Sequence, residues 1–359
     1  MAASEPPEPR RVLLEDVAQR AGVSRATASR ALADNRRISA ATRALVKNAA
    51  IELRYVPNAA GRSLRARRTQ TLGAVIVDFS DPYHGLVAAG FEMEAGEAGY
   101  TVIFVAGLND PVRERRGLRI LVEHGTEGIA LVSGVLHPSE ASTLARANRL
   151  VLVQPDHRTL IRGRGELPPG VILTDDVSGM EAVVDHLVAG GYRDIGYVGA
   201  GAMWSNAVRR DTAVRRLRQH GVHRSLRRFQ AGEGGYQASA AIAAAVALDL
   251  PEALICYDDK LALALLDGLR DHGIRVPEDV ALVGFDDIPS AKLSNPRLTT
   301  IAVPTHEMGR LAARALIGAI QAGELPPAVV LPVELAVRAS TPRLRWRRRQ
   351  AVAEGDGHA

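Results

Sequence analysis

The sequence predicts an α/β protein in two parts, an all-α N-terminal headpiece and a larger body of two doubly wound parallel sheets. Residues 16–32 show helical spacing of apolar residues on both sides of a central glycine. From Thr71 onward, apolar runs of strand length alternate with helical stretches, which is typical of parallel α/β sheets. A chain of 359 residues favours two or three domains and allows a large core.

Residues 16–32, DVAQRAGVSRATASRAL, predict two short helices joined by a tight turn. Val17, Ala18 and Ala21 are spaced as on one helix face. Gly22 follows where a left-handed helix end suits a residue without Cβ, and Ser24 stands where a second helix needs an N-cap. The alternative to a helix-turn-helix is an ordinary helical hairpin with a solvated charged face. Side chains that suit phosphate oxygens and guanine edges in a major groove occupy the outward positions of the second helix: Arg25, Thr27, Ser29 and Arg30.

The charge distribution favours DNA binding. Residues 1–70 hold 14 Lys and Arg against 6 Asp and Glu, a net charge of +8, so the other 289 residues carry −3 of the overall +5. A phosphate-contacting module needs such a local excess of basic side chains. The excess coincides with the helix-turn-helix, which a solvated basic face alone does not predict.

Composition bears on several other classes of protein. Hydrophobic residues make up 47% and charged residues 24% of the chain, and no run of about 18 apolar residues predicts a transmembrane helix. The acidic, proline-rich start MAASEPPEPRR does not resemble a signal peptide. The single cysteine, Cys256, can form no internal disulfide, and its apolar neighbours favour a small buried hydrophobe over a catalytic thiol. We therefore expect a cytoplasmic protein.

A third helix is predicted to begin after Ser39 and to end at Tyr55-Val56-Pro57, because Pro disfavours helix in the residue before it. We expect a disordered tail over residues 1–11, a helix-turn-helix DNA-binding domain over 12–57, and a hinge helix with linker over 58–69. The apolar stripe of the third helix comprises Leu45, Val46, Ala49, Ala50 and Leu53.

The run 16–32, followed by ISAATR (38–43), LRYVPN (53–58) and AAGRSLR (59–65), resembles the N-terminus of the lactose-repressor (LacI/GalR) family of bacterial transcription regulators. Leu13 departs from the Thr or Ser that usually caps the family's first helix, so we expect a loose helix start and one missing phosphate contact. The resemblance implies that the DNA contacts come from Ser24, Arg25, Ala26, Thr27, Ser29, Arg30, Asn35, Tyr55, Asn58, Ala60 and Leu64.

Residues 58–65 are too few for a stable free helix. In the family this hinge folds when two copies meet in the DNA minor groove, and Leu64 matches the leucine that wedges between base steps. The resemblance therefore implies a homodimer on a near-palindromic operator of double-stranded DNA. The tail 343–359 is basic, is expected to be disordered and carries no leucine heptads, so we expect no tetramer.

The body, residues 70–342, is predicted to hold two series of strands and helices. Strands are expected at 72–77, 101–105, 128–132 and 150–153, then in a second series at 171–173, 195–198, 253–256 and 280–283. The two subdomains resemble periplasmic sugar-binding proteins, the architecture of the family's body. We expect the first lobe at about 70–172 and 300–332, and the second at about 173–299 and 333–342. Further stretches that resemble the family are 175–179, 185–187, 190–195, 276–280 leading into 284–288, and 298–301 with Pro304.

The resemblance implies an effector site between the lobes, after strands of both. Asp81-Pro82-Tyr83-His84 takes the place of the family's N-P-F/Y-F/Y, and Tyr83 is expected to stack on a sugar ring or a base. Arg209 and Asp286 match pocket residues that suit adjacent hydroxyls or a carboxylate, and Ser205 would line the same loop. Gln154 stands where an Asp is common, Asp258 where Asn is usual, and His84 replaces an aromatic residue. We expect a small polar effector, a sugar or sugar derivative.

Other chemistries fit less well. Gly199-Ala200-Gly201 begins like a dinucleotide fingerprint, but Trp204 is too large for the third glycine position. Asp258-Asp259 and Asp286-Asp287 allow a metal or acid–base pair, although carboxylates at strand ends more simply accept hydrogen bonds from ligand hydroxyls. We find no catalytic constellation, so we expect no enzyme activity, cofactor or metal. The interpretation is a ligand-responsive transcription regulator, a repressor; its rivals are a solute-binding protein without a regulatory role and an α/β enzyme.

Overall fold

The computed structural model describes residues 12–56, 68–145, 149–155, 167–201, 204–222, 226–231 and 239–342. The chain divides into two compact units between Thr69 and Gln70, the headpiece and the body, and each is described by itself. The predictions for residues 1–11, for most of the hinge and for the tail 343–359 lie outside the described residues. No helix in the described part of the chain is long and apolar enough to cross a membrane.

The headpiece consists of the three predicted helices, α1 (Leu14–Arg20), α2 (Arg25–Leu32) and α3 (Ala40–Glu52). Gly22 turns the chain at φ +64°, and the Ser24 hydroxyl caps α2 by accepting a hydrogen bond from the Thr27 N–H at 3.1 Å. Leu13 offers no side-chain cap to α1, as predicted, but its N–H donates to Asp16 Oδ2 at 2.7 Å. The small core consists of Val17, Ala18, Ala21, Ala28, Ala31, Val46, Ala49 and Ala50.

One residue of the predicted α3 stripe was assigned wrongly. Leu45 is 57% exposed, whereas its neighbour Val46 is fully buried. Three short helices bury only a narrow stripe of α3, and the Leu45 side chain lies beyond its edge.

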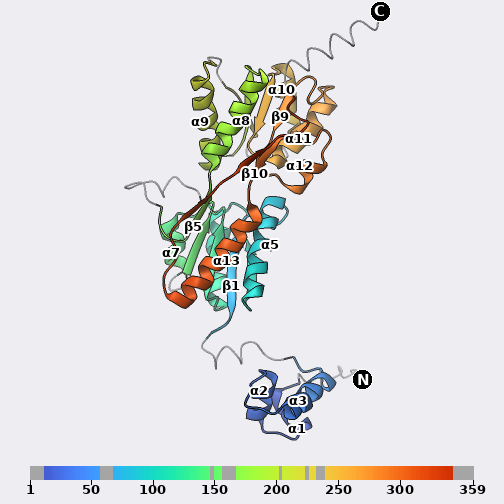
Figure 1. The fold of residues 1–359 in the computed structure, drawn as a ribbon, viewed down its shortest axis with the longest axis vertical. Helices are drawn as coiled ribbons and strands as arrows, with labels where there is room; N and C mark the ends of the chain where they lie inside the picture. The colour runs from blue at the N-terminus through green and yellow to red at the C-terminus, as the bar shows by residue number, and fades with distance from the viewer. Residues whose placement is uncertain are drawn as a thin grey trace, which may run out of the picture. The chain divides into compact units, whose positions relative to one another are not determined.

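The first lobe of the body is built on a parallel sheet of six strands in the order β11-β5-β4-β3-β1-β2. Helices α5 (Pro82–Glu97) and α13 (Thr305–Ala322) lie side by side on one face (Figure 1), and α6 (Pro111–Glu123) and α7 (Pro138–Ala145) pack on the other. The strands are β1 (Thr71–Ile76), β2 (Thr101–Ala106), β3 (Gly128–Val132), β4 (Arg149–Val153), β5 (Val171–Thr174) and β11 (Val329–Leu331).

The second lobe holds a parallel sheet of four strands in the order β7-β6-β8-β9. Its strands are β6 (Ile195–Ala200), β7 (Arg227–Ala231), β8 (Ala253–Cys256) and β9 (Ala281–Val283). Helices α8 (Asp176–Gly190) and α9 (Trp204–Gln219) cover one face, and α10 (Ser239–Leu248) and α11 (Asp259–Asp271) the other. The short helix α12 (Pro289–Leu293) follows β9.

The strand at 171–173 was expected to open the second series, and this assignment was wrong. It forms β5, which pairs in parallel with β4 and β11 in the first sheet. An apolar run predicts a strand but carries no information about its partner, because the partner is chosen by long-range packing.

Three segments of chain connect the lobes. The first runs from β5 to α8, the second from α12 to α13, and the third from β11 to β12 (Glu334–Ala336). Two of them pair as a small antiparallel ribbon, β10 (Thr300–Ala302) with β12. Figure 1 shows β10 between the two sheets of the body. The ribbon keeps the carboxyl ends of both parallel sheets facing a common space, which is where α/β folds bind ligands.

Candidate functional sites: the helix-turn-helix surface and the cavity between the lobes

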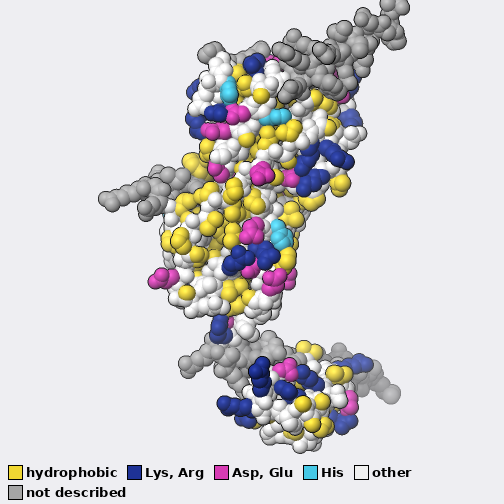
Figure 2. Space-filling model, in the orientation of Figure 1, with side chains coloured by type: hydrophobic (Ala, Val, Ile, Leu, Met, Phe, Trp, Pro, Cys, Tyr) yellow, Lys and Arg dark blue, Asp and Glu magenta, His cyan; other side chains and the backbone are white. Residues whose placement is uncertain are grey.

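The predicted DNA-contacting residues of the headpiece gather at the start of α2 and beside it. Arg25, Ala26 and Arg30 are exposed, and Lys and Arg side chains spread over the headpiece face drawn in Figure 2. Arg25 Nε lies 3.8 Å from Glu15 Oε2, and both side chains are largely in solvent, so this pair adds little stability. The guanidinium therefore stays available to a phosphate or a base edge.

The other predicted contacts of the headpiece combine surface and structural positions. The Ser24 hydroxyl is bonded to Thr27 Oγ1 at 2.9 Å as well as to the Thr27 N–H. Asn35 is exposed and accepts from the Arg37 N–H, and Tyr55 packs against the headpiece core. The remaining predicted contacts, Asn58, Ala60 and Leu64, lie outside the described residues.

A cavity of about 440 Å³ lies between the two lobes of the body, a volume that suits a small organic ligand. Its lining includes the carboxyl ends of β4, β5 and β8, the start of α5 and the first turns of α9. All seven side chains predicted for the effector site line it: Tyr83, His84, Gln154, Ser205, Arg209, Asp258 and Asp286. The structure thus brings these positions together, and their contact with an effector stays a prediction.

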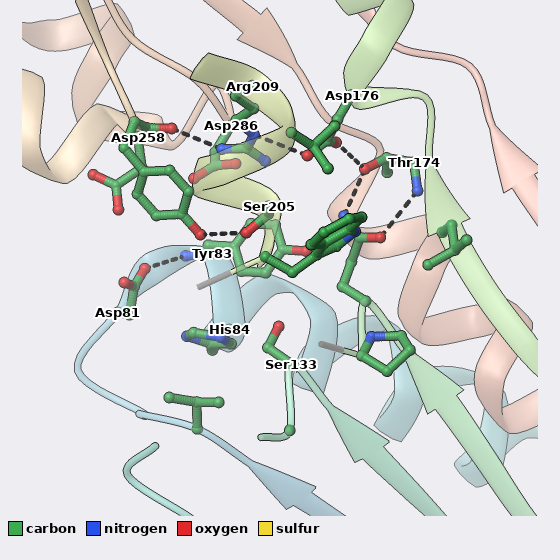
Figure 3. A pocket seen from close by; sticks show the side chains of 18 of the residues that line it. Asp81, Tyr83, His84, Ser133, Thr174, Asp176, Ser205, Arg209, Asp258 and Asp286 are labelled. Carbon is green, nitrogen blue, oxygen red and sulfur yellow. Dashed lines mark hydrogen bonds and ion pairs between the residues drawn. The ribbon is translucent and has the colours of Figure 1, made fainter. Parts of the chain in front are cut away.

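A continuous chain of polar contacts crosses the cavity wall from the first lobe to the second (Figure 3). Gln154 Nε2 donates to Thr174 Oγ1 at 2.6 Å, and its Oε1 accepts from the Thr174 N–H at 3.1 Å. Thr174 Oγ1 donates to Asp176 Oδ1 at 2.7 Å, and Asp176 Oδ2 accepts from Arg209 Nε at 2.8 Å. Gln154 therefore holds the end of β5, and through it the carboxylate that binds Arg209.

Arg209 is held more tightly than the sequence indicated. A second guanidinium nitrogen, Nη1, donates to the Tyr257 carbonyl oxygen at 2.7 Å, and Cζ lies 3.5 Å from the centre of the Phe285 ring. The side chain is only 5% exposed. Burial lowers the pKa of Arg209, but Asp176, Tyr257 and Asp286 outweigh this effect and the net shift is upward, so the guanidinium stays charged.

The aspartates of the two adjacent pairs, Asp258-Asp259 and Asp286-Asp287, have different structural roles. Asp258 caps α11 by accepting from the Leu261 N–H at 2.7 Å. Asp259 is fully buried and accepts from Thr300 Oγ1 at 2.5 Å and from the Ile288 N–H at 2.9 Å, which ties α11 to the ribbon and to α12. Burial raises the pKa of Asp259 to about 7. Asp287 pairs with Arg338 at 2.6 Å.

Asp286 differs from these structural carboxylates. It sits in the left-handed region at φ +114°, which costs strain for a residue with a Cβ, and it lines the cavity. Burial raises the pKa of Asp286 well above its ordinary value. No group of His, Cys, Asp and Glu side chains able to hold a metal ion is found within the described ranges.

Tyr83 and His84 form an aromatic corner at the start of α5. The rings meet edge to face with centroids 5.1 Å apart, and Tyr83 Oη points at Met308 Sδ at 3.9 Å. His84 Nδ1 is buried without a hydrogen-bond partner among the described residues, and burial lowers the pKa of this imidazole. Ser205 Oγ bonds Tyr257 Oη at 2.8 Å on the opposite side.

Sequence reasoning missed Asp176 and Tyr257, which hold Arg209, and Lys260, whose Nζ lies 3.8 Å from Asp81 Oδ2. A signal for Asp176 was present, since it follows β5 at the carboxyl end of a strand. Its partner Arg209 lies 33 residues further on, beyond the reach of local pattern.

Two family models match this chain. Residues 13–58 match the model described as bacterial regulatory proteins, lacI family, and residues 184–341 match the periplasmic binding protein-like domain. The HTH-type transcriptional regulator DegA of Bacillus subtilis (strain 168) is 31% identical, over 91% of this chain and 97% of its own. The chain belongs to the lacI family of bacterial regulatory proteins.

Other relatives agree with this assignment. The HTH-type transcriptional repressor CytR of Escherichia coli (strain K12) is 30% identical to this lacI-family chain, over 91% of it and 96% of CytR. The lac repressor dimer bound to operator and the anti-inducer ONPF has the same fold, with a TM-score of 0.81 at 22% identity, covering 93% of this chain and all of that one. The CelR–cellobiose complex has a TM-score of 0.66 at 29% identity, covering 92% and 100%. This lacI-family protein is a helix-turn-helix transcription regulator.

Proposed function

We propose that this lacI-family regulator represses transcription as a homodimer on a near-palindromic operator. We also propose that a small polar effector, a sugar or sugar derivative, controls it from the cavity between the lobes. This proposal rests on the observation that residues from both lobes line the cavity. One ligand would contact both lobes at once, so its binding free energy would depend on their arrangement.

Three relatives support repression, a dimer on operator DNA and a sugar ligand. CytR is named a repressor, the lac repressor was solved as a dimer on operator DNA, and CelR was solved with cellobiose. We also propose that this chain acts in the cytoplasm, where its operator DNA would lie. The hinge contacts of Asn58, Ala60 and Leu64 stay part of the proposal, with Leu64 as the wedge at the operator centre.

Base reading is assigned to the exposed start of α2. Arg25 and Arg30 suit guanine edges, and Ala26, which has no hydrogen-bonding reach, would pack on a thymine methyl. Genome-wide mapping of bound sites gives the operator, and affinities for its single-base variants follow. Arg30→Ala should cost about 1–3 kcal/mol of discrimination at one symmetric pair of positions.

Lys47→Ala is the matched control, since it removes one positive charge from α3 of the same unit. It should leave sequence preference unchanged. An affinity loss that is equal for all sequences in Arg30→Ala would reduce Arg30 to a phosphate contact and contradict its assignment to base reading.

A further inference from the structure

We propose that the cavity is built for a polyhydroxylated ligand that carries a protonated amine, and that the Asp286 carboxylate binds this ammonium group. The inference rests on the proposed function, because it names the ligand class of the same cavity. It goes beyond a neutral sugar, which the resemblance alone implies.

The charges of the lining favour a cation. Among the described residues, six carboxyl groups line the cavity against two permanent cations, Arg209 and Lys260. Arg209 is already paired with Asp176 at 2.8 Å, and Lys260 Nζ lies 3.8 Å from Asp81 Oδ2. Such a lining repels a phosphorylated or carboxylated ligand and attracts a positive one. The six carboxyl groups belong to Asp78, Asp81, Asp175, Asp176, Asp258 and Asp286.

Most of these carboxylates already serve the fold. Asp78 accepts from the Ser80 N–H and hydroxyl, and Asp175 accepts from Ser178 in the same way. Asp81 and Asp258 cap the helices that follow them, α5 and α11. Each of these four carboxylates already accepts a hydrogen bond that holds a turn or a helix start, so a direct ligand contact would compete with a structural role.

Asp286 is the exception. Its carboxyl group makes no hydrogen bond or ion pair with any residue that the structure describes, although its backbone N–H bonds the Ile301 carbonyl oxygen at 2.9 Å. Figure 3 shows it beside the Arg209 guanidinium and on the same side of the cavity as Asp258. A strained backbone at φ +114° thus holds toward the cavity a carboxyl group that has no partner among the residues the structure describes.

The neighbours of Asp286 explain why an ammonium ion suits it. Burial and the nearby carboxyls raise its pKa, and Arg209 only partly opposes them. Its raised pKa keeps a larger share of the Asp286 carboxyl protonated at any given pH than an ordinary aspartate would have. An incoming ammonium favours the carboxylate, and the proton then leaves to solvent as the ion pair forms. The groups that face Asp286 are Arg209 from α9, Asp258 and Asp259 at the start of α11, Tyr257 after β8, and Asp81 and Tyr83 at the start of α5.

Matched pairs of sugars test the proposal on the full chain. Glucosamine, galactosamine and mannosamine are compared with glucose, galactose and mannose, and with their N-acetyl derivatives, which lack the charge. Trp204 lines the cavity, so its fluorescence reports binding. We expect at least one amine to bind roughly ten- to a hundredfold more tightly than its neutral partner, the strength of a hydrogen bond to a charged group.

Calorimetry in buffers of different ionisation enthalpy measures the released proton. The wild type should release protons as it binds the amine, and over the pH range in which Asp286 titrates its affinity for the amine should rise with pH, until the amine itself loses its charge. Asp286→Asn should abolish the proton release and the preference for the amine over the neutral sugar.

Asp175→Asn is the matched control, because it removes the same charge from the same cavity at a carboxylate that caps α8. It should keep most of the preference for the amine. An equal loss in Asp175→Asn and Asp286→Asn would overturn the direct contact. Neutral sugars that bind as tightly as the amines, or no amine that binds at millimolar concentration, would also overturn the proposal.

Operator affinity separates this inference from the proposed function. If a neutral sugar changes operator affinity and no amine does, the regulator senses a ligand in the cavity and the amine inference fails. If an amine binds with Asp286-dependent proton release but operator affinity stays constant, the amine inference holds and effector control fails.

Discussion

At the scale of single residues, the cavity combines groups that a ligand can reach with groups that hold the wall. Arg209 belongs to the wall as much as to the site. Its guanidinium neutralises Asp176, bonds the Tyr257 carbonyl and covers the Phe285 ring, all within a side chain that is 5% exposed. Replacing Arg209 should therefore change the stability of the body as well as ligand binding.

Arg209→Ala should therefore destabilise the body by about 3–5 kcal/mol, the cost of leaving one charge of a buried pair alone. Arg210→Ala is the control in the next position, because its partner Asp211 is 63% exposed, and it should cost less than about 1 kcal/mol. Urea unfolding of the full chain, followed by circular dichroism, measures both. Similar costs for the two variants would contradict the structural role of Arg209.

At the scale of elements, the first lobe depends on the close crossing of α5 and α13. Glycines line this contact from both helices. A Cβ at Gly309 would lie 2.0 Å from the Val87 carbonyl oxygen and 2.6 Å from the Phe91 nitrogen, and a Cβ at Gly90 would lie 2.0 Å from the His306 carbonyl oxygen. The backbones touch, so no side chain fits between them.

Gly309→Ala should destabilise the body by about 1–3 kcal/mol or more, because backbone atoms cannot yield as a side chain can. Gly318→Ala lies in the same helix with nothing within 4 Å of its Cβ, and should stabilise by about 0.5–1 kcal/mol through helix propensity. Thermal unfolding of both variants checks this pair. A Gly309→Ala variant as stable as the wild type would refute the tight crossing.

At the scale of the whole molecule, the body consists of two lobes that are joined by three segments of chain and have a cavity between them. The polar chain from Gln154 through Thr174 and Asp176 to Arg209 spans from the first lobe to the second. A ligand in the cavity can shift the arrangement of the lobes only by its differential affinity for the alternatives.

If such a ligand controls operator binding, the coupling should be about 1–3 kcal/mol and reciprocal. Fluorescence titration of the ligand with and without operator DNA, and titration of operator with and without ligand, give two independent factors. They should agree. Gln154→Ala, which releases the end of β5, should reduce the coupling more than it reduces operator affinity in the absence of ligand. Two unequal factors would show that the measurements do not report one linked equilibrium.

Much of this protein follows from the sequence by itself. The helical spacing around Gly22, the caps at Ser24 and Ser39, and the alternation of strands and helices are all encoded within a few neighbouring residues. Seven of the residues that line the cavity were predicted because their order along the chain resembles that of a known family, and because strand ends of an α/β fold meet at a common edge.

Only the tertiary structure determined which strands pair and which side chains contact one another. It placed β5 in the first sheet, left Leu45 in solvent, paired Arg209 with Asp176, and gave adjacent aspartates different tasks. Strand pairing and buried ion pairs join residues that are tens of positions apart, and their free energy depends on the packing around both partners. Local periodicity carries no information on that packing, whereas local sequence carries much of the information on where a helix begins and approximately which face it buries.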